Sequence, residues 1–335
     1  MTTRVVKQDG TGDYTNLTAA FAATSSAGDI IEIQDSETYN EGNLGVFPVR
    51  EDITVRAAPG YTPVLDGGGT LDCAIKFWIG WVIEGLTITG YDGTTTDAAG
   101  FTSMSGFRTV TIRNCTLHNL ADVAIHKLGT GSLVENCTIY NIHTGVSAKG
   151  IHGSVYAVTI KNCLLYDIID DGIYATNAST VIEHCTLFNV GYGGNAYGIL
   201  ATLGTVKYCI ISDKYHILSD AGLRATTHSY NCVSGSEDSD DGNFYGGAGT
   251  GDIQSDPLLI TGTFKIPITS PCIAAAVGST RTMDITSGSV TWRYSQKVNG
   301  VNVGATPNEM GAYEFQYTTV MGVDTNKVAS VMNVS

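Results

Sequence analysis

Six cysteines in the middle of the chain recur at nearly constant intervals. From Cys115 to Cys232 the intervals are 22, 26, 22, 24 and 23 residues. The sequence around them recurs as well, as TVTIRNCTLHNL, SLVENCTIYNI, AVTIKNCLLYDI and TVIEHCTLFNV. A period of ~20–50 residues is typical of repeat proteins, in which each repeat packs only against its neighbours. The chain is therefore expected to form a solenoid.

Each repeat predicts three short β-strands. β-Branched residues lie on both sides of the cysteine, in segments that are too short for helices. A third apolar segment follows, as in VAIHKLG, KGIHGSV and DGIYATN, and it usually begins after Gly. These strands predict an all-β fold, a single-stranded parallel β-helix whose right-handed coils run from about residue 30 to 260.

The residue before the cysteine marks a corner. In four repeats it is Asn114, Asn136, Asn162 and Asn231. Asn tolerates left-handed backbone, and its amide can bond the Asn of the next coil. The cysteines are then expected to point inward and stack as small buried groups, with a disulfide as the alternative. No CxxC or Cys/His spacing indicates a structural zinc site.

Composition and charge exclude several classes of protein. Among 335 residues, 18 basic and 32 acidic side chains give a net charge of −14. A nucleic-acid-binding protein needs a basic surface, so nucleic acid is not expected as a partner. No segment has the ~18 consecutive apolar residues of a membrane span, so membrane insertion is not expected either. Apolar residues make up 43% of the chain, which is enough for a large core.

The Asn corner and the Gly-Ile strand after it resemble the right-handed parallel β-helix proteins of the pectin-lyase-like superfamily, over about residues 50–235. The segment VVKQDGTGDYTNLTAAFAAT resembles the opening strand and capping helix of pectinesterases. The segment GDIQSDPLLITGTFKIPITSPCI resembles a closing element of such proteins. We expect four regions: an N-terminal cap with the first coil (1–50), the β-helix (51–260), the closing element (261–316) and a tail (317–335).

The physical pattern agrees with a capping helix near residues 15–24. Leu17, Ala20, Phe21 and Thr24 share one helical face, which can cover the open end of the solenoid.

The superfamily includes lyases, hydrolases, esterases, epimerases and adhesins, so the fold alone does not predict a reaction. Polygalacturonases carry Asn-Thr-Asp, Asp-Asp, Gly-His-Gly and Arg-Ile-Lys motifs, and only Asp170-Asp171 matches. The paired Asp motifs of pectinesterases and the Asp-Pro-His motif of the epimerases are absent from the sequence. The resemblance therefore implies a role on polysaccharides without naming the chemistry.

Alternation along the third strand predicts which side chains face outward. The coils align on one inward residue each: Ile125, Ile151, Ile173, Ile199 and Leu223. The outward residue follows it, which gives Lys76, Thr102, His126, His152, Tyr174, Leu200 and Arg224. Because adjacent coils lie ~4.8 Å apart, the two His and the Tyr are expected to form a vertical ladder.

The turn before the third strand adds polar side chains to this face. One row holds Val123, Lys149, Asp171 and Tyr197, and the row before it holds Asp122, Ala148, Asp170 and Ala196. His, Lys, Tyr and Asp are residue types that transfer protons, so the face is the expected site. The alternative is a solvated face of ordinary polar residues.

One candidate reaction is β-elimination from a uronic acid. It needs a base at C5, an acid for the leaving oxygen and a group that neutralises the carboxylate. Lys149 or His152 fits the base, Tyr174 the acid, and His126 or Arg224 the neutralising group. The ladder favours this reaction slightly, whereas the net negative charge opposes a polyanionic substrate unless a cation intervenes.

The other candidate reaction is inverting hydrolysis, which needs two carboxylates ~6.5–9.5 Å apart. Asp122 and Asp170 lie in one row with a single coil between them, which gives roughly 9.6 Å between their backbones. The alternative is that Asp170 and Asp171 cap the turn before Gly172 and have no catalytic role.

Two further segments are candidates for binding. Residues 234–252, SGSEDSDDGNFYGGAGTGD, hold four closely spaced carboxylates that can bind Ca²⁺, although the spacing does not fit an EF-hand. The alternative is a solvated linker. Tyr192 and Tyr197 are expected in turns, where aromatic faces can stack on sugar rings, and ordinary packing is the alternative.

The sequence pattern changes after Phe315. Val298-Asn299-Gly300-Val301 and Val320-Met321-Gly322-Val323 are related, and resemble short repeated tails of environmental phage structural proteins. This resemblance implies an extracellular or virion-associated protein, and the apolar tail suits a homotrimer or a tail folded back on its own chain. The leading hypothesis is an enzyme that degrades a polysaccharide, and the others are a glycan-binding adhesin and a structural spacer.

Overall fold

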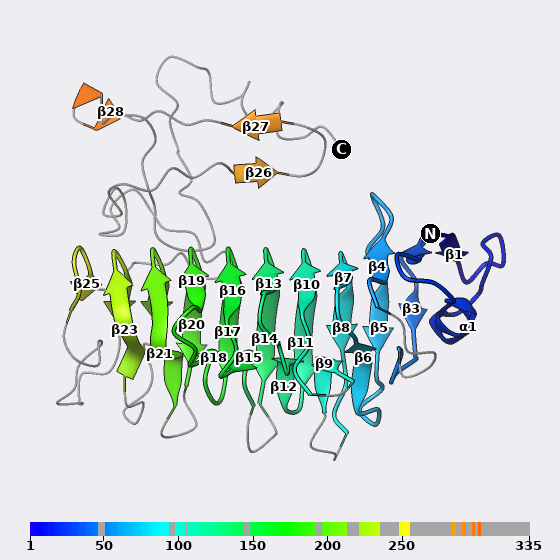
Figure 1. Cartoon of the computed structure of the whole chain (residues 1–335), viewed down its shortest axis with the longest axis horizontal. Coiled ribbons are helices and arrows are strands. Elements are labelled where there is room, and N and C mark those ends of the chain that lie inside the picture. Colours follow the sequence, from blue (N-terminus) through cyan, green and yellow to red (C-terminus); the bar gives the residue numbers. More distant parts are fainter. Residues whose placement is uncertain are drawn as a thin grey trace.

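The computed structural model describes residues 1–45, 51–93, 98–104, 106–143, 148–191, 196–212, 221–234 and 248–254, and four short strands between residues 283 and 302. Successive coils pair in parallel and in register, which gives the elongated stack of strands in Figure 1. The predicted parallel β-helix is confirmed.

From Thr54 to Lys207, each coil contributes a strand to each of three faces. The first face contains β1 (Thr3–Val6), β2 (Ile30–Ile33), β4 (Thr54–Ala57), β7 (Trp81–Glu84), β10 (Val110–Arg113), β13 (Ser132–Glu135), β16 (Val158–Lys161) and β19 (Val181–Glu183). The second face contains β3 (Thr38–Tyr39), β5 (Val64–Asp66), β8 (Thr87–Thr89), β11 (Thr116–Leu120), β14 (Thr138–Ile142), β17 (Leu164–Ile168), β20 (Thr186–Val190), β22 (Ile210–Ser212), β24 (Cys232–Ser234) and β25 (Ile253–Gln254). The third face contains β6 (Cys73–Phe77), β9 (Ala99–Ser103), β12 (Val123–His126), β15 (Ile151–Ser154) and β18 (Ile173–Ala175).

Two long strands join the third face to the first face of the following coil. They are β21 (Tyr197–Lys207) and β23 (Ala221–Ser229). In β21, Ile199 pairs with Ile173 on the third face, whereas Thr205 pairs with Val181 on the first face. These strands therefore make one continuous 15-stranded sheet out of two faces.

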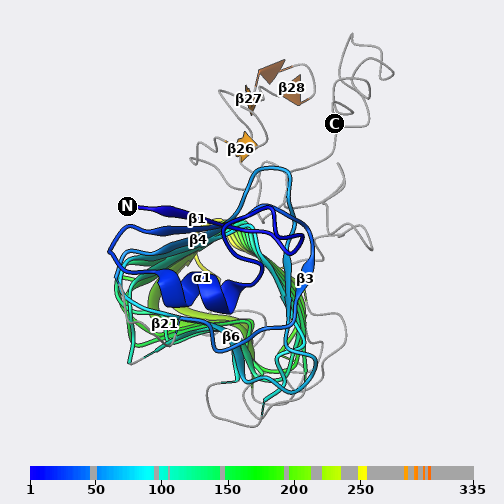
Figure 2. The same ribbon diagram turned by 90° about the vertical axis from the view of Figure 1, so that its right-hand side faces the viewer.

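Helix α1 (Leu17–Ala23) closes the N-terminal end, as Figure 2 shows in the view along the stack. Its apolar face is buried, and the Phe21 ring stacks on Trp81 at 5.9 Å. Asn16 caps the helix by accepting from the Ala19 amide, and Glu41 accepts from the Leu17 amide. The expected capping helix is confirmed. No helix in the described part of the chain is long and apolar enough to span a membrane.

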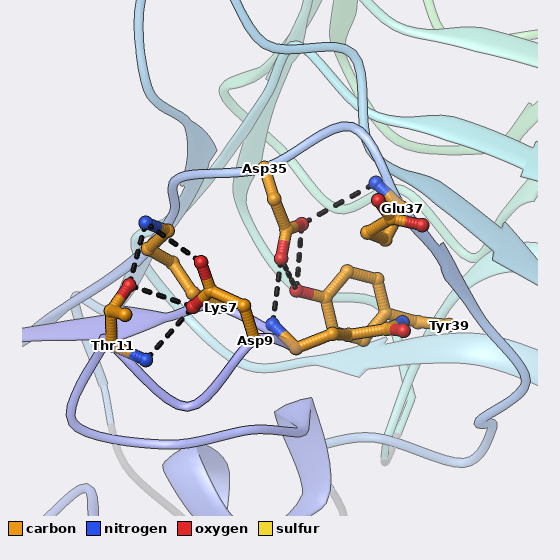
Figure 3. A network of polar contacts seen from close by, with 7 residues as sticks. Lys7, Asp9, Thr11, Asp35, Glu37 and Tyr39 are labelled. Atoms are coloured by element: carbon orange, nitrogen blue, oxygen red, sulfur yellow. Dashed lines mark hydrogen bonds and ion pairs between the residues drawn. The ribbon is translucent and has the colours of Figure 1, made fainter.

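A polar network ties the loop after β1 to the first coil (Figure 3). The Asp35 carboxylate accepts from the Tyr39 hydroxyl at 2.8 Å and from the Gln8 amide at 2.7 Å. Burial, together with Asp35, raises the pKa of Tyr39, so the hydroxyl stays a donor. Lys7 pairs with Asp9 at 3.3 Å on the same loop. The network holds the end of the solenoid in a fixed shape.

The cysteine corner forms as the sequence predicts in four consecutive coils. Asn114, Asn136 and Asn162 have φ of 54–56°, and His184 takes the same left-handed conformation in the next coil. The cysteines that follow are buried, and each thiol contacts the carbonyl two residues earlier at 3.3–3.4 Å. None of the seven cysteines among the described residues is in a disulfide.

The last repeat departs from this prediction by one residue. Ile210 pairs with Cys232, so Asn231 occupies the cysteine row after Cys209, and the left-handed residue is Tyr230. The Asn231 side chain is fully buried, and its Oδ1 accepts from the Cys209 amide at 2.9 Å. Cys232 is buried, but the prediction that it continues the cysteine stack is wrong.

A second corner, at the end of each second-face strand, was not anticipated from the sequence. Asn119, Asn141, Asp167 and Asn189 occupy it with φ of 51–54°. Here amides bond along the stack, because Asn141 Nδ2 donates to Asn119 Oδ1 at 3.2 Å. An amide-to-amide bond therefore occurs at the second corner, where it was not expected, whereas at the first corner Asn114 donates to the Glu84 carboxylate.

The remaining strands form two antiparallel hairpins. They are β26 (Met283–Ile285) with β27 (Val290–Trp292), and β28 (Lys297–Val298) with β29 (Val301–Asn302). The rest of the closing element, the tail and the four carboxylates of the predicted Ca²⁺ loop lie outside the described residues. The homotrimer and the Ca²⁺ site stay predictions.

The thiols of the cysteine row are expected to be chemically silent in the folded protein. All of these thiols are buried, so a reagent reaches them only when the fold opens, and burial by itself disfavours the reactive thiolate. In a Cys272→Ser variant, Ellman's reagent should react roughly 10³-fold more slowly with the native protein than with the denatured protein. Fast reaction of several thiols in the native protein would contradict the stacked row.

Candidate functional site on the third face

The register of the third face is the one expected from the sequence. Ile125 pairs with Ile151, Ile151 with Ile173, and Ile199 with Leu223. These aliphatic side chains are fully buried. The side chains one residue later lie on the outer surface and are half-buried in most coils. The candidate site is therefore on the outside of β12, β15, β18 and β21.

Three rings form the expected ladder along this surface. The His126 and His152 rings stack at 4.9 Å with an interplanar angle of 15°. The Tyr174 ring meets His152 edge-on at 5.0 Å and 88°. The row of outward positions that contains these rings begins with Lys76 and Thr102. Thr102 is fully buried, so the prediction that its side chain faces outward is wrong.

Glycine at the start of the third strand sets the direction of the preceding side chain. A Cβ on Gly150 would lie 2.5 Å from the Gly172 carbonyl and 2.7 Å from Leu165 Cδ2 in the core. Position 150 thus faces inward, as does Ile151 beside it. Two consecutive inward positions interrupt the alternation, and Lys149 is consequently turned to the outer surface.

Lys149 forms an ion-pair cluster with two carboxylates from the next coil. Its Nζ donates to Asp170 Oδ2 and, at 2.8 Å, to Asp171 Oδ2. The same ammonium lies 5.5 Å from the centre of the Tyr174 ring, within cation–π range. The cluster therefore connects the turn residues to the ring ladder.

Asp171 is buried, contrary to its expected partial exposure. Only 6% of its side chain is accessible, against 22% for Asp170. Its Oδ1 accepts from the Tyr197 amide at 2.8 Å, which anchors the following coil. Because both carboxylate oxygens have protein partners, Asp171 holds the turn together, and Asp170 is the more accessible carboxylate.

The two expected sugar-stacking tyrosines have different outcomes. Tyr197 is the first residue of β21 and is buried, so its expected position in an exposed turn is wrong. Its hydroxyl accepts from Arg224 at 3.0 Å, and the guanidinium lies over its ring. Tyr192 lies outside the described residues. Arg224 is thus held at one end of the surface.

Asp122 lies in the turn between β11 and β12 and is half-buried. Asp170 donates its amide to the Ala148 carbonyl, which places Asp170 one coil from Ala148. This agrees with the row in which Asp122 and Asp170 are separated by one coil. The main chains of Asp122 and Asp170 therefore keep the register expected from the sequence.

The environment sets the protonation of His152 and Lys149 in opposite directions. Burial, and then the Lys149 charge, lower the pKa of His152 to about 4, although Asp170 opposes this. His152 is therefore neutral at neutral pH. Burial alone would lower the pKa of Lys149, but its bonds to Asp170 and Asp171 outweigh this and raise it. Burial raises the pKa of Asp171.

Comparison with known families agrees with this architecture. Residues 99–250 match the family model described as a right handed beta helix region. The matched residues include the whole ring ladder. The chain folds as a parallel β-helix. No curated protein matches it. The wider pectin-lyase-like superfamily and a phage origin remain predictions for this β-helix protein.

Two other ladders on the β-helix were missed in the sequence. On the second face, the His118, Tyr140 and Tyr166 rings stack at 4.8 and 4.7 Å. On the first face, acidic and basic residues alternate from coil to coil, as in the Glu84–Arg113 pair. The sequence signal for both ladders is visible in the repeated phrase. His118, Tyr140 and Tyr166 occupy one matching position of it, and Glu84 and Arg113 occupy another.

The described residues contain no cluster of three or more His, Cys, Asp or Glu side chains arranged to hold a metal ion.

Replacing Gly150 by Ala should disturb both the core and the site. The new methyl group would press on the Gly172 carbonyl, and the expected loss of stability is ~1–3 kcal/mol. Gly153→Ala is the matched control, because the nearest atoms to its methyl would be side-chain atoms, Val158 Cγ2 at 3.0 Å and Ala175 Cβ at 3.4 Å, and not main chain. Thermal unfolding of both variants checks this, and an equal or smaller loss in Gly150→Ala would contradict the packing argument.

Proposed function

We propose that this β-helix protein binds and degrades an extracellular or surface polysaccharide along the outside of the third face. The observation that carries the proposal is the contact between a neutral His152 and Tyr174 on adjacent coils, with His126 and Lys149 beside them. Groups that transfer protons and lie within one coil of each other can act on the same sugar linkage. An extracellular or virion-associated location is part of the proposal.

The chemistry that this arrangement supports best is β-elimination from a uronic acid. Neutral His152 removes the C5 proton, the bond from C4 to the leaving oxygen breaks, and a C4–C5 double bond forms. Tyr174 supplies a proton to the leaving oxygen. Either His126, one coil before His152, or Arg224, two coils beyond Tyr174, would face the substrate carboxylate.

The contacts of Lys149 favour His152 over Lys149 as the base. A lysine whose pKa is raised by two carboxylates is protonated at neutral pH and is a poor base. His152 has already lost its proton at that pH. Lys149 therefore holds Asp170 and Asp171 in place, and the role of base goes to His152.

One observation favours a second function, binding without catalysis. The Lys149 charge is matched by two carboxylates, so this cluster has an excess of negative charge and repels a uronate. A non-catalytic adhesin for a neutral glycan suits that charge. Inverting hydrolysis of a neutral glycan, with Asp122 and Asp170 as the carboxylate pair, suits it as well.

Variants of the ring ladder test the proposed enzyme. On a polysaccharide panel followed at 235 nm, which detects the double bond, His152→Ala and Tyr174→Phe should each lower the rate by ~10²–10⁴. The matched controls are His118→Ala and Tyr140→Phe, which remove the same groups from a stacked ladder on the second face. The controls should keep the full rate.

The outcomes of the same panel separate the alternatives. Reducing ends without absorbance at 235 nm, lost in Asp122→Asn and Asp170→Asn, would replace elimination by hydrolysis. Glycan binding without any cleavage, weakened by Tyr174→Ala, would identify an adhesin. Full activity in all four catalytic variants would place the site elsewhere.

The shifted pKa of His152 predicts a pH dependence of stability. The pKa is about 4 in the folded state and ~6.5 in the unfolded state. The unfolded chain binds more protons in that window, so His152 costs stability progressively as the pH falls from ~6.5 to ~4. With allowance for solvent screening, the cost at pH 4 is roughly 1–2 kcal/mol.

His152→Gln should therefore lose less stability than the wild type between pH 6.5 and pH 4. Chemical denaturation at both pH values measures the difference. An identical or steeper loss in His152→Gln would show that the histidine is not held neutral by its surroundings.

A further inference from the structure

The outer surface of the first face carries a ladder of alternating charge. We call it the charge ladder, and its eight rungs in order are Glu32, Arg56, Glu84, Arg113, Glu135, Lys161, Glu183 and Lys207. Each residue pairs in register with the next, on consecutive coils. Acidic and basic residues alternate at every step, without an exception.

Neighbouring rungs form ion pairs within the chain, in which the basic side chains stay accessible, whereas the Glu32 and Glu84 side chains are 13% and 28% exposed. Arg56 pairs with Glu32 at 2.6 Å, and Arg113 pairs with Glu84 at 2.9 Å. The exposed fractions of the Arg56 and Arg113 side chains are 39% and 42%. Such surface pairs contribute little to stability on their own. The ladder can therefore still interact with a partner.

The charge ladder is neutral in a protein that is strongly acidic. Four acidic and four basic rungs cancel, whereas the whole chain has a net charge of −14. Two copies of such a chain repel each other over most of their surfaces. Along the charge ladder two copies can approach without this net repulsion.

The row beside the charge ladder consists of short, compact side chains. Its residues are Thr54, Val82, Thr111, Leu133, Thr159, Val181, Thr205 and Thr227. All but the last are half-buried. A row of Thr, Val and Leu gives a flat surface, which suits contact with another flat sheet.

We propose that the first face is an interface with a second, antiparallel copy of this chain. A two-fold axis between Arg113 and Glu135 brings rung one opposite rung eight, and rung two opposite rung seven. Because the eight charges alternate, every rung then meets the opposite charge. Arg56 meets Glu183 of the second copy, and the same contact occurs twice, as an isologous interface requires.

The dimensions predict a weak dimer. Eight rungs at ~4.8 Å span roughly 38 Å, and a strand of four residues is roughly 13 Å wide. The contact is about 500 Å² per copy, below the ~800 Å² per partner of a standard stable interface. The dimer is expected to form at micromolar concentrations and to dissociate as salt screens the charges.

Sedimentation velocity of the full chain tests the proposal, over a concentration series in low and high salt. The wild type should form a salt-sensitive dimer. Arg56→Glu should weaken it at least about tenfold, because like charges then face each other at two symmetric places. The double variant Arg56→Glu, Glu183→Arg should restore it.

Restoration in the double variant can come only from contact between copies. In one chain Arg56 and Glu183 are five rungs apart, roughly 24 Å, so they cannot compensate each other there. Lys76→Glu, on the third face, makes the same change of charge and should leave the dimer intact. Circular dichroism verifies the fold of each variant.

A second charge exchange keeps the test valid if Arg56→Glu does not fold. Glu84→Arg with Lys161→Glu exchanges rungs three and six, which also face each other in the proposed dimer. A monomer at all salt concentrations overturns the proposal. So does a trimer that is unaffected by these variants, or a failure of both exchanges to restore the dimer.

Discussion

The in-register pairing of one coil with the next is the constraint on which the rest of the structure depends. Main-chain hydrogen bonds set the position of each coil relative to the next. Examples are the bonds from the Ala124 amide to the Lys149 carbonyl and from the Gly150 amide to the Asp171 carbonyl. A position in one coil therefore becomes a vertical row in the molecule. Corners need left-handed residues such as Asn114, and the inward turn needs Gly150, because a methyl group there meets main chain.

The repeated phrase predicts the fold and the third-strand ladder because both follow from that pairing. Its predictions are wrong where the coil geometry changes. Asn231 replaces a cysteine in the inward row, a one-residue slip that the position of Cys232 conceals. Burial of Asp171 and Tyr197 depends on contacts between coils, which a strand-by-strand pattern does not contain. The charge ladder was readable in the sequence, since it needs only the register.

Each face of the solenoid presents a different chemistry as a result. The third face combines neutral His152 with Tyr174 and an accessible carboxylate, Asp170. The second face stacks rings such as His118 on Tyr140, which leaves mainly ring edges for a partner. The first face is electrically neutral. Proton transfer to a sugar linkage fits the third face best, and association with a second copy fits the first.

A crystal structure of the His152→Ala variant with an oligosaccharide from the panel tests the central claim most directly, because the variant can bind substrate without consuming it. The account predicts a sugar chain along the outside of β12, β15 and β18, with one linkage beside Tyr174 and Asp170. An oligosaccharide bound instead along His118, Tyr140 and Tyr166 on the second face would contradict it.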